Sequence, residues 1–351
     1  MTEIHKLSAY LAERERHGCR FLTEEILELF ERRRVAASVA LRGITSFGPR
    51  NVIRTDELLS SSEDLPVVLT AVDEAATIAA LAGEVADRVT RGLLTVERAR
   101  VATNGELPAT AAETVLMTLL LTRRQRADGV PAHIAATSVL HRLGFMGAVC
   151  FLGVDGTIAG TRHRARFFSA NTDVPMLVTA IGSRSQVGDA VAELRGLTDR
   201  PLIERVQVCK RDGRLLARPH ALPGTDADGL ELRQKLVVYS DEDARHDGVP
   251  IHRALVARLR SAGAAGATVL RGVWGFVGDQ PPHGDRLLRL TRRVPVATVI
   301  IDTPAGIAEH FGIVDAVTAE HGLVTSEMLP AALLRDGTHC RGGLSLGRHR
   351  Y

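Results

Sequence analysis

The sequence predicts an α+β protein built from three tandem copies of one β-α-β-β-α-β unit. A short β-prone apolar run follows a helix-like segment three times, and the runs end at Gly43, Gly153 and Gly272. Each of these glycines lies 24 or 25 residues after an earlier glycine and 22 or 23 residues before a proline. The repeat period is 110 and then 119 residues, a length typical of a whole domain. We therefore expect three small domains rather than a solenoid.

Composition places the boundaries between the repeats. A short linker covers residues 104–112, and a longer stretch over 211–229 is rich in Arg, Pro, Gly and Asp, which is typical of exposed connections. The C-terminal residues are rich in Gly, Arg and His, which favours a mobile tail. The expected domains are repeat one over 1–105, a degenerate repeat two over 113–211, repeat three over 232–335, and a tail over 336–351.

Repeat one has the clearest pattern of elements. Ile26, Leu29 and Phe30 recur at helical spacing, with acidic residues in the first turn and arginines in the last, which suits the helix dipole. Asp73 is placed to cap a second helix. In order, the predicted elements are a strand over 4–11, a helix over 23–33, strands over 35–41 and 67–72, a helix over 73–89 and a strand over 93–101. This order is the ferredoxin-like arrangement.

The other repeats follow the same order. Pro131, Pro250 and Pro304 stand where a helix should begin, at positions where a missing amide proton has no cost. The strands expected in repeat two cover about 115–122, 148–154, 174–181 and 202–209.

The third strand of each repeat is apolar at nearly every position, over 67–72, 174–181 and 296–301. A four-stranded antiparallel sheet with helices on one side should alternate, because its other face meets water. We therefore expect the helix-free faces to be buried against one another around a pseudo-threefold axis within the chain. The alternative is that these faces pair with another chain.

Composition excludes several functional classes. The net charge of +3 over 351 residues gives no support for nucleic-acid binding, and no apolar run is long enough to span a bilayer. The N-terminus has no signal-peptide layout, and the four cysteines lie far apart, as is typical of reduced thiols. A cytoplasmic location is expected.

These patterns resemble the PII-like signalling family, specifically the bacterial domain-of-unknown-function class numbered 190. In repeat one the resemblance rests on Lys6-Leu7, Tyr10, Glu13, His17-Gly18, Leu41-Arg42-Gly43, Phe47-Gly48, Ser62 to Val68 and Val72-Asp73. In repeat three it rests on Lys235-Leu236, Tyr239, Glu242, His246, Gly248 to Pro250, Gly266 to Gly272, Gly275-Phe276 and Pro295-Val296. Repeat two departs from the pattern, with Leu152 in place of arginine and Thr157 in place of phenylalanine.

The resemblance implies ferredoxin-like subunits that act as trimers, so one chain would form an intramolecular PII-like pseudo-trimer and remain a monomer. Such trimers bind nucleotides or small anionic effectors in clefts between subunits. They signal through a mobile loop between the second and third strands, often to a membrane transporter. Gene neighbourhood in this class suggests a fluoride channel as the partner. The corresponding loops here cover 44–65, 154–173 and 273–293.

Arg42 and Arg271 each precede a strand-ending glycine, and guanidinium groups suit phosphate or carboxylate. The alternative is an ion pair within the domain. The loops are basic, and Arg54, His163 and His283 share one equivalent position; a solvated face is the alternative there. Further loop cations are Arg162, Arg164, Arg166, Arg286 and Arg289. The candidate ligand-binding residues are Arg42, Gly43, Phe47, Arg50, Arg54, His163, Arg271, Gly272, Phe276 and His283.

Catalytic and metal motifs are not expected. The sequence has no phosphate-binding Gly-x-x-x-x-Gly-Lys and no helical His-x-x-x-His with carboxylate support. The nucleotide loop of typical PII proteins is also replaced, which argues against ATP binding of the usual kind. At that place the repeats read Arg91-Gly92-Leu93, Asp199-Arg200-Pro201 and His321-Gly322-Leu323.

The leading hypothesis is a non-enzymatic sensor of a small anionic effector, with an adenine nucleotide as the candidate and no resident cofactor. Divergence of repeat two predicts clefts that are not equivalent, and fewer than three ligands. The alternatives are a ligand-independent interaction protein that docks a membrane channel, and an enzyme on the same scaffold.

Overall fold

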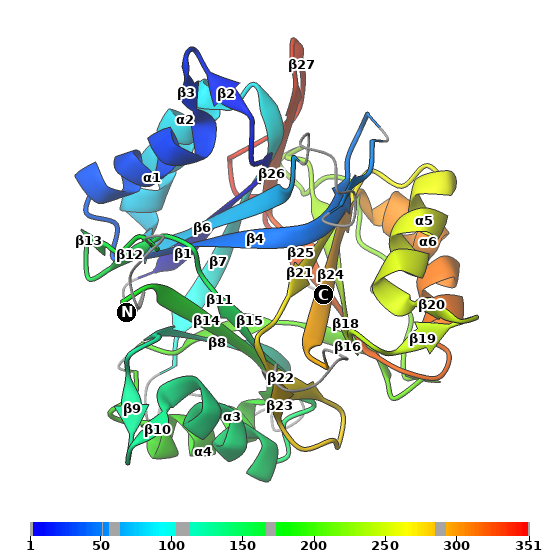
Figure 1. The fold of residues 1–351 in the computed structure, drawn as a ribbon. Coiled ribbons are helices and arrows are strands. Elements are labelled where there is room, and N and C mark those ends of the chain that lie inside the picture. Colours follow the sequence, from blue (N-terminus) through cyan, green and yellow to red (C-terminus); the bar gives the residue numbers. More distant parts are fainter. Residues whose placement is uncertain are drawn as a thin grey trace.

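The computed structural model describes residues 3–50, 52–55, 64–102, 113–165, 173–198, 200–284 and 293–349. Within these residues the chain is α+β, and each repeat forms an antiparallel sheet with two helices on one face. In Figure 1 the three helix pairs lie on the outside and the sheets converge in the middle.

Repeat one forms a sheet in the order β4-β6-β1-β7. Its main elements are β1 (Ile4–Ala12), α1 (Leu22–Arg32), β4 (Ala37–Phe47), β6 (Pro66–Glu74), α2 (Ala75–Arg88) and β7 (Arg91–Val101). Its short strands are β2 (Arg16–His17), β3 (Arg20–Phe21) and β5 (Arg54–Thr55).

Repeat two has the order β11-β14-β8-β15. Its main elements are β8 (Thr114–Thr122), α3 (Ala132–Arg142), β11 (Gly147–Leu152), β14 (Pro175–Ser183), α4 (Arg184–Glu193), β15 (Leu202–Arg205) and β16 (Gln207–Arg211). Its short strands are β9 (Arg126–Ala127), β10 (Val130–Pro131), β12 (Thr157–Ile158), β13 (Thr161–Arg162) and β17 (Arg214–Leu215).

Repeat three has the order β21-β24-β18-β25. Its main elements are β18 (Arg233–Asp241), α5 (Ile251–Ser261), β21 (Ala267–Arg271), β22 (Trp274–Val277), β24 (Pro295–Asp302), α6 (Pro304–Val317), β25 (Leu323–Leu329), β26 (Ala331–Asp336) and β27 (His339–Gly343). Its short strands are β19 (Arg245–His246), β20 (Val249–Pro250) and β23 (His283–Gly284).

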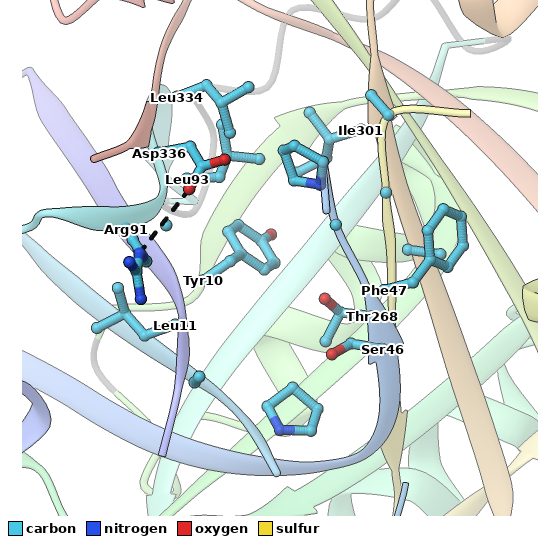
Figure 2. Close-up of a pocket in the computed structure, with 18 of the residues that line it drawn as sticks. Tyr10, Leu11, Ser46, Phe47, Arg91, Leu93, Thr268, Ile301, Leu334 and Asp336 are labelled. Carbon is cyan, nitrogen blue, oxygen red and sulfur yellow. Dashed lines mark ion pairs between the residues drawn. The ribbon is translucent and has the colours of Figure 1, made fainter. Parts of the chain in front are cut away.

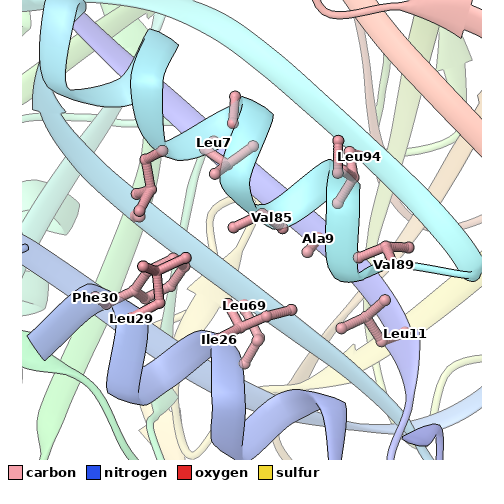
Figure 3. Close-up of a cluster of buried hydrophobic side chains, with 14 of the residues drawn as sticks. Leu7, Ala9, Leu11, Ile26, Leu29, Phe30, Leu69, Val85, Val89 and Leu94 are labelled. Atoms are coloured by element: carbon pink, nitrogen blue, oxygen red, sulfur yellow. The ribbon is translucent and has the colours of Figure 1, made fainter. Parts of the chain in front are cut away.

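Each repeat has its own core between its helices and its sheet. In repeat one, Ile26 and Phe30 of α1 and Val85 of α2 pack on Leu7 and Leu69 of the sheet (Figure 3). Burying an apolar side chain of this size stabilises the fold by roughly 1.5–3 kcal/mol.

Asp73 has a different role from the one its position predicts. Its carboxylate does not cap α2 through a hydrogen bond to the third helical residue; it accepts a hydrogen bond from the backbone N–H of Ala36, at 2.8 Å. Asp302 of repeat three accepts from the N–H of Ala265 in the same way, at 3.0 Å. These carboxylates hold the start of the second strand in place.

A further apolar cluster lies between the helix-free faces of the three sheets. It includes Leu41 and Val68 of repeat one, Phe151 of repeat two, and Val237 and Leu270 of repeat three. These faces are therefore buried within one chain, as their apolar third strands indicate.

Two cyclic sets of strand pairs join the repeats. Beyond its strand-ending glycine, the chain crosses to the second strand of another repeat: β4 pairs with β21, β12 with β4, and β22 with β11. At the fourth strands, β7 pairs with β15, β16 with β25, and β26 with β7. Both sets of pairs close into rings, so every repeat contacts the other two.

The C-terminal segment over 336–351 is expected to be a mobile tail, but its described residues, 336–349, include a strand and contacts with repeat one. β27 pairs with β26, which itself pairs with β7. Leu344 and Leu346 pack against the core of repeat one, and Arg98 donates hydrogen bonds to the carbonyls of Leu346 and Gly347. The glycine-rich composition did not predict this hairpin, because the strand it pairs with, β7, lies more than two hundred residues earlier in the sequence. No helix in the described part of the chain is long and apolar enough to cross a membrane.

Candidate functional site

A cleft with a volume of about 180 Å³ lies between repeats one and three. Repeat one contributes the end of β1, the segment after β4 and the start of β7. Repeat three contributes the start of β21, the end of β24, and β26. Strands from the two ends of the chain therefore enclose one site (Figure 2).

The path of β4 builds one side of this cleft. At Gly43 the strand passes so close to its neighbours that a Cβ atom would lie 2.8 Å from the carbonyl oxygen of Val269 and from Pro66. Glycine permits this approach because it has no side chain. The strand then continues along β21 and places Ser46 and Phe47 at the cleft.

The walls of the cleft are largely apolar. Tyr10, Leu93, Ile301 and Leu334 lie around it in Figure 2, and Phe47 lines it while packing into the core of repeat three. Burial raises the pKa of Tyr10 to about 12, so its phenol stays neutral at physiological pH. Such walls suit a flat apolar group.

The charged groups of the cleft are mainly basic. Its lining holds five arginines, at positions 50, 54, 91, 233 and 335, and three acids, Glu15, Asp302 and Asp336. Asp336 lies 2.9 Å from Arg50 and 3.8 Å from Arg91. The Nε atom of Arg335 is buried, and no described residue gives it a hydrogen-bond partner. The lining therefore has an excess of positive charge and an unused buried donor.

The equivalent place between repeats three and two is acidic. A cavity of about 300 Å³ there is lined by four acids, Asp212, Asp241, Asp243 and Glu320, with Arg293 and His321. The Nε2–H of His283 donates a hydrogen bond to the carboxylate of Asp241, at 3.0 Å. Burial opposes protonation of His283, but the bond to Asp241 raises the pKa of the imidazole above its usual value. This cavity does not match an anion.

At the third place, between repeats two and one, the β12–β13 hairpin packs against repeat one. Arg162 lies 2.7 Å from Asp155 and 3.0 Å from Glu24, and only 9% of its side chain is exposed. The hydrogen bonds to Asp155 raise the pKa of Arg162, so its charge is permanent. The buried pair of Arg162 with Asp155 lies within repeat two, and the contact of Arg162 with Glu24 links it to repeat one.

The structure places three of the candidate ligand-binding residues in the first cleft: Phe47, Arg50 and Arg54. Arg54 also lies 3.3 Å from Asp64. The other seven candidates do not line this cleft.

Arg42 and Arg271 form ion pairs within their own repeats, which is the alternative that the sequence leaves open. Arg42 pairs with Glu13, and Arg271 lies 2.6 Å from Glu242. In repeat two both partners are replaced: Leu152 stands in place of the arginine, and Arg123 stands in place of the glutamate. The parallel loss supports a structural role for the pair.

The remaining candidates contribute to packing or to the two other interfaces. A Cβ at Gly272 would lie 2.7 Å from Val149, so this glycine, like Gly43, permits a close approach of strands. Phe276 is fully buried in the core of repeat two, edge-to-face with His141 at 4.9 Å. The backbone N–H of His163 donates to the carbonyl of Gly156. Arg166, Arg286 and Arg289 lie outside the described residues.

Sequence reasoning missed Arg91, Arg335 and Asp336 as cleft residues. Arg91 was visible only as part of a replaced nucleotide loop. Arg335 is the last residue of the predicted repeat three, and Asp336 is the first residue of the predicted tail. No local signal connects β26 to repeat one, so only the folded chain brings these residues together.

The fold and the cleft define a tandem-repeat α+β protein with a ligand-sized site where repeats meet, and with no metal-binding cluster among the described residues.

Comparison with known proteins then identifies the family. The chain belongs to DUF190 (Uncharacterized ACR, COG1993), whose model matches residues 4–101, 114–208 and 233–331. This confirms the resemblance to the PII-like class. The chain is also similar to a UPF0166 protein of Aquifex aeolicus (strain VF5), with 29% identity over 98 residues. That match covers 27% of this chain and 90% of the relative, so one repeat corresponds to nearly the whole relative. Membership in this PII-like family suggests a regulatory, non-enzymatic role.

Proposed function

We propose that this chain is a single-polypeptide counterpart of a PII-type trimer, with ferredoxin-like repeats in place of subunits, and acts as a cytoplasmic, non-enzymatic regulator. Its effector is a small organic anion bound between repeats one and three. The buried, unpartnered Nε of Arg335 in a basic, apolar-walled cleft is the observation that carries this proposal. The length of the relative supports this proposal, because one repeat of this chain matches nearly the whole relative. Three repeats in one chain would therefore take the place of three separate subunits.

The chemistry of the cleft favours a ligand with a flat apolar part and an anionic part. Tyr10, Leu93 and Ile301 offer apolar contacts to a ring. Arg335 and Arg50 offer charge-assisted hydrogen bonds to a phosphate or carboxylate. An adenine nucleotide has both parts and is the leading candidate.

One ligand per chain is expected. The second place is acidic and repels an anion, and the β12–β13 hairpin with Arg162 packs at the third. A symmetric trimer of identical subunits would have three equal clefts.

Isothermal titration calorimetry of the full chain with ATP, ADP, AMP and cyclic AMP tests this function. We expect one site for at least one of them, and a loss of affinity of about tenfold or more in Arg335→Met, since a lost charge-assisted bond contributes roughly 1.5 kcal/mol or more. Arg142→Met, an exposed arginine paired with Glu193 on repeat two, is the matched control and should bind normally. The proposal fails if folded protein gives no heat with any of these anions, or if Arg335→Met binds as well as the control.

Signalling to a membrane transporter or channel is proposed as the output. The loop after β4 supplies Arg50 and Arg54 to the cleft, so a bound anion contacts the segment that PII-type proteins use to reach their partners. Pull-down from membrane fractions with and without nucleotide separates a ligand-dependent partner from ligand-independent docking. Equal capture in both conditions would favour the docking protein.

A further inference from the structure

The five charged side chains Lys6, Glu97, Glu204, Lys235 and Glu327 form a buried chain of ion pairs between the three repeats. All of them are at least 87% buried. The three glutamates occupy equivalent places on the fourth strands, where they lie opposite Lys6, Leu116 and Lys235 of the first strands. Repeats one and three therefore contribute a lysine and a glutamate each, whereas repeat two contributes a glutamate alone.

Each lysine bridges the glutamate of its own repeat and that of the next. The Nζ atom of Lys6 lies 3.4 Å from Glu97 and 2.6 Å from Glu204. The Nζ atom of Lys235 lies 2.9 Å from Glu327 and 2.6 Å from Glu97. By the same rule, a lysine at position 116 would bridge Glu204 and Glu327 and close the ring. Leu116 leaves the ring open between these two carboxylates.

The open ring has three carboxylates and two ammonium groups, so it is one positive charge short. Burying an uncompensated carboxylate is costly, and such a group takes up a proton instead. Glu327 has the weakest partner, because Lys235, its only close cation among the described residues, lies nearer to Glu97. We propose that a proton replaces the missing lysine, so that Glu327 is a neutral carboxylic acid in the folded protein and the joint between the three repeats depends on pH.

The electrostatic surroundings agree with this assignment. Burial raises the pKa of Glu327 to about 7, and the charges of Glu97 and Glu204 act in the same direction, while Lys235 and Lys6 oppose them. The other titratable groups near the cluster are the phenols of Tyr10 and Tyr239, and burial raises the pKa of both, so they stay neutral. A cavity of about 110 Å³ borders Leu116 and Glu327 and has room for water, which would let the proton exchange.

The sign of the pH effect follows from linkage. The folded state holds the proton up to about pH 7, whereas an unfolded glutamate releases it near its ordinary pKa of 4.5. The stabilisation is therefore complete below that ordinary pKa and is lost as pH rises through about 7. Within this window each pH unit should raise the unfolding equilibrium constant of the native chain about tenfold relative to a variant without the group.

Two substitutions remove the effect by opposite routes. Glu327→Gln leaves two carboxylates with two ammonium groups, and Leu116→Lys supplies the third ammonium group. Urea unfolding of the full chain from about pH 5 to about pH 8 should show a tenfold-per-unit difference between the native chain and Glu327→Gln up to about pH 7, and no further change above it. Glu193→Gln, an exposed glutamate on repeat two, is the control and should follow the native chain.

Infrared difference spectra provide a readout that does not depend on stability. The carbonyl band of a protonated carboxylic acid should appear in the native chain below about pH 7. It should be missing from Glu327→Gln and, if that variant folds, from Leu116→Lys. The proposal is overturned if the native chain and Glu327→Gln share the same pH dependence and the same band. It is also overturned if replacing choline by sodium or potassium at constant ionic strength abolishes the band, since a metal cation would then fill the gap.

Discussion

Arg162 is the buried arginine that joins repeats two and one, and its removal gives the sharpest test of how the repeats are held together. Its guanidinium donates to both carboxylate oxygens of Asp155, at 2.9 and 2.7 Å, and to Glu24 at 3.0 Å. Asp155 is 4% exposed, and its backbone carbonyl also accepts from the N–H of Ala40 in repeat one. The substitution Arg162→Met keeps most of the volume of the side chain but leaves the buried Asp155 with only the more distant cation of Arg164, at 3.8 Å.

Removing one partner from a buried ion pair costs roughly 3–5 kcal/mol. The backbone N–H of Gly156 still donates to Asp155, at 2.7 Å, so we expect a loss of about 3 kcal/mol, near the lower limit. Arg164→Met is the matched control. Arg164 lies 3.2 Å from the same Glu24 and 3.8 Å from Asp155, but its side chain is 60% exposed. Its loss should therefore cost less than about 1 kcal/mol.

Urea denaturation followed by circular dichroism at neutral pH measures the loss of stability in both variants. If unfolding stays cooperative, the slope of the unfolding free energy against urea concentration should not change. The double variant Arg162→Met/Asp155→Asn removes both charges and should recover part of the loss, because no uncompensated carboxylate remains. Equal, small losses in Arg162→Met and Arg164→Met would refute the reasoning, since Asp155 would then be solvated in spite of its buried position.

Three further predictions concern packing, the C-terminal hairpin and the thiols. Gly43→Ala should lower the free energy of unfolding, measured with urea, by roughly 2 kcal/mol, because the new Cβ would lie 2.8 Å from the carbonyl oxygen of Val269. Gly48→Ala is the control and should leave the stability nearly unchanged, because a Cβ there would have no atom within 4 Å. Deleting residues 338–351 removes the contacts of Leu344 and Leu346 with the core of repeat one, so it should lower the free energy of unfolding by about 2 kcal/mol or more. An unchanged midpoint of urea unfolding would show that the hairpin contributes nothing to stability. A thiol reagent should label the exposed Cys19 and Cys340 rapidly in native protein, and the buried Cys150 and Cys209 only after unfolding. Burial raises the pKa of the Cys209 thiol to about 12 and that of the Cys150 thiol further, so neither forms a reactive thiolate. Fast labelling of Cys150 in native protein, detected by mass spectrometry, would contradict this prediction.

The repeat and its elements could be predicted because their signals are local. The run that ends at Gly43 and the helical spacing of Ile26 and Phe30 depend only on neighbours a few residues away. The continuous apolar third strands also indicated that the helix-free faces are buried, since a solvated face would have required alternation.

The partners of charged side chains could not be predicted in the same way. Arg42 and Arg54 look alike as basic residues beside one loop, yet Arg42 pairs with Glu13 while Arg54 lines the cleft. Arg335 is the last residue before the segment whose composition suggested a mobile tail. Its place in the cleft depends on the pairing of β26 with β7, far apart in sequence.

The amino-acid order alone thus determined a threefold repeat, its α+β elements and its family, because periodicity and spacing are written within each repeat. Only the tertiary structure decided which cleft is basic and that the ion-pair ring lacks one cation at Leu116. Both depend on distances between residues of different repeats, and those distances exist only once the chain has closed on itself.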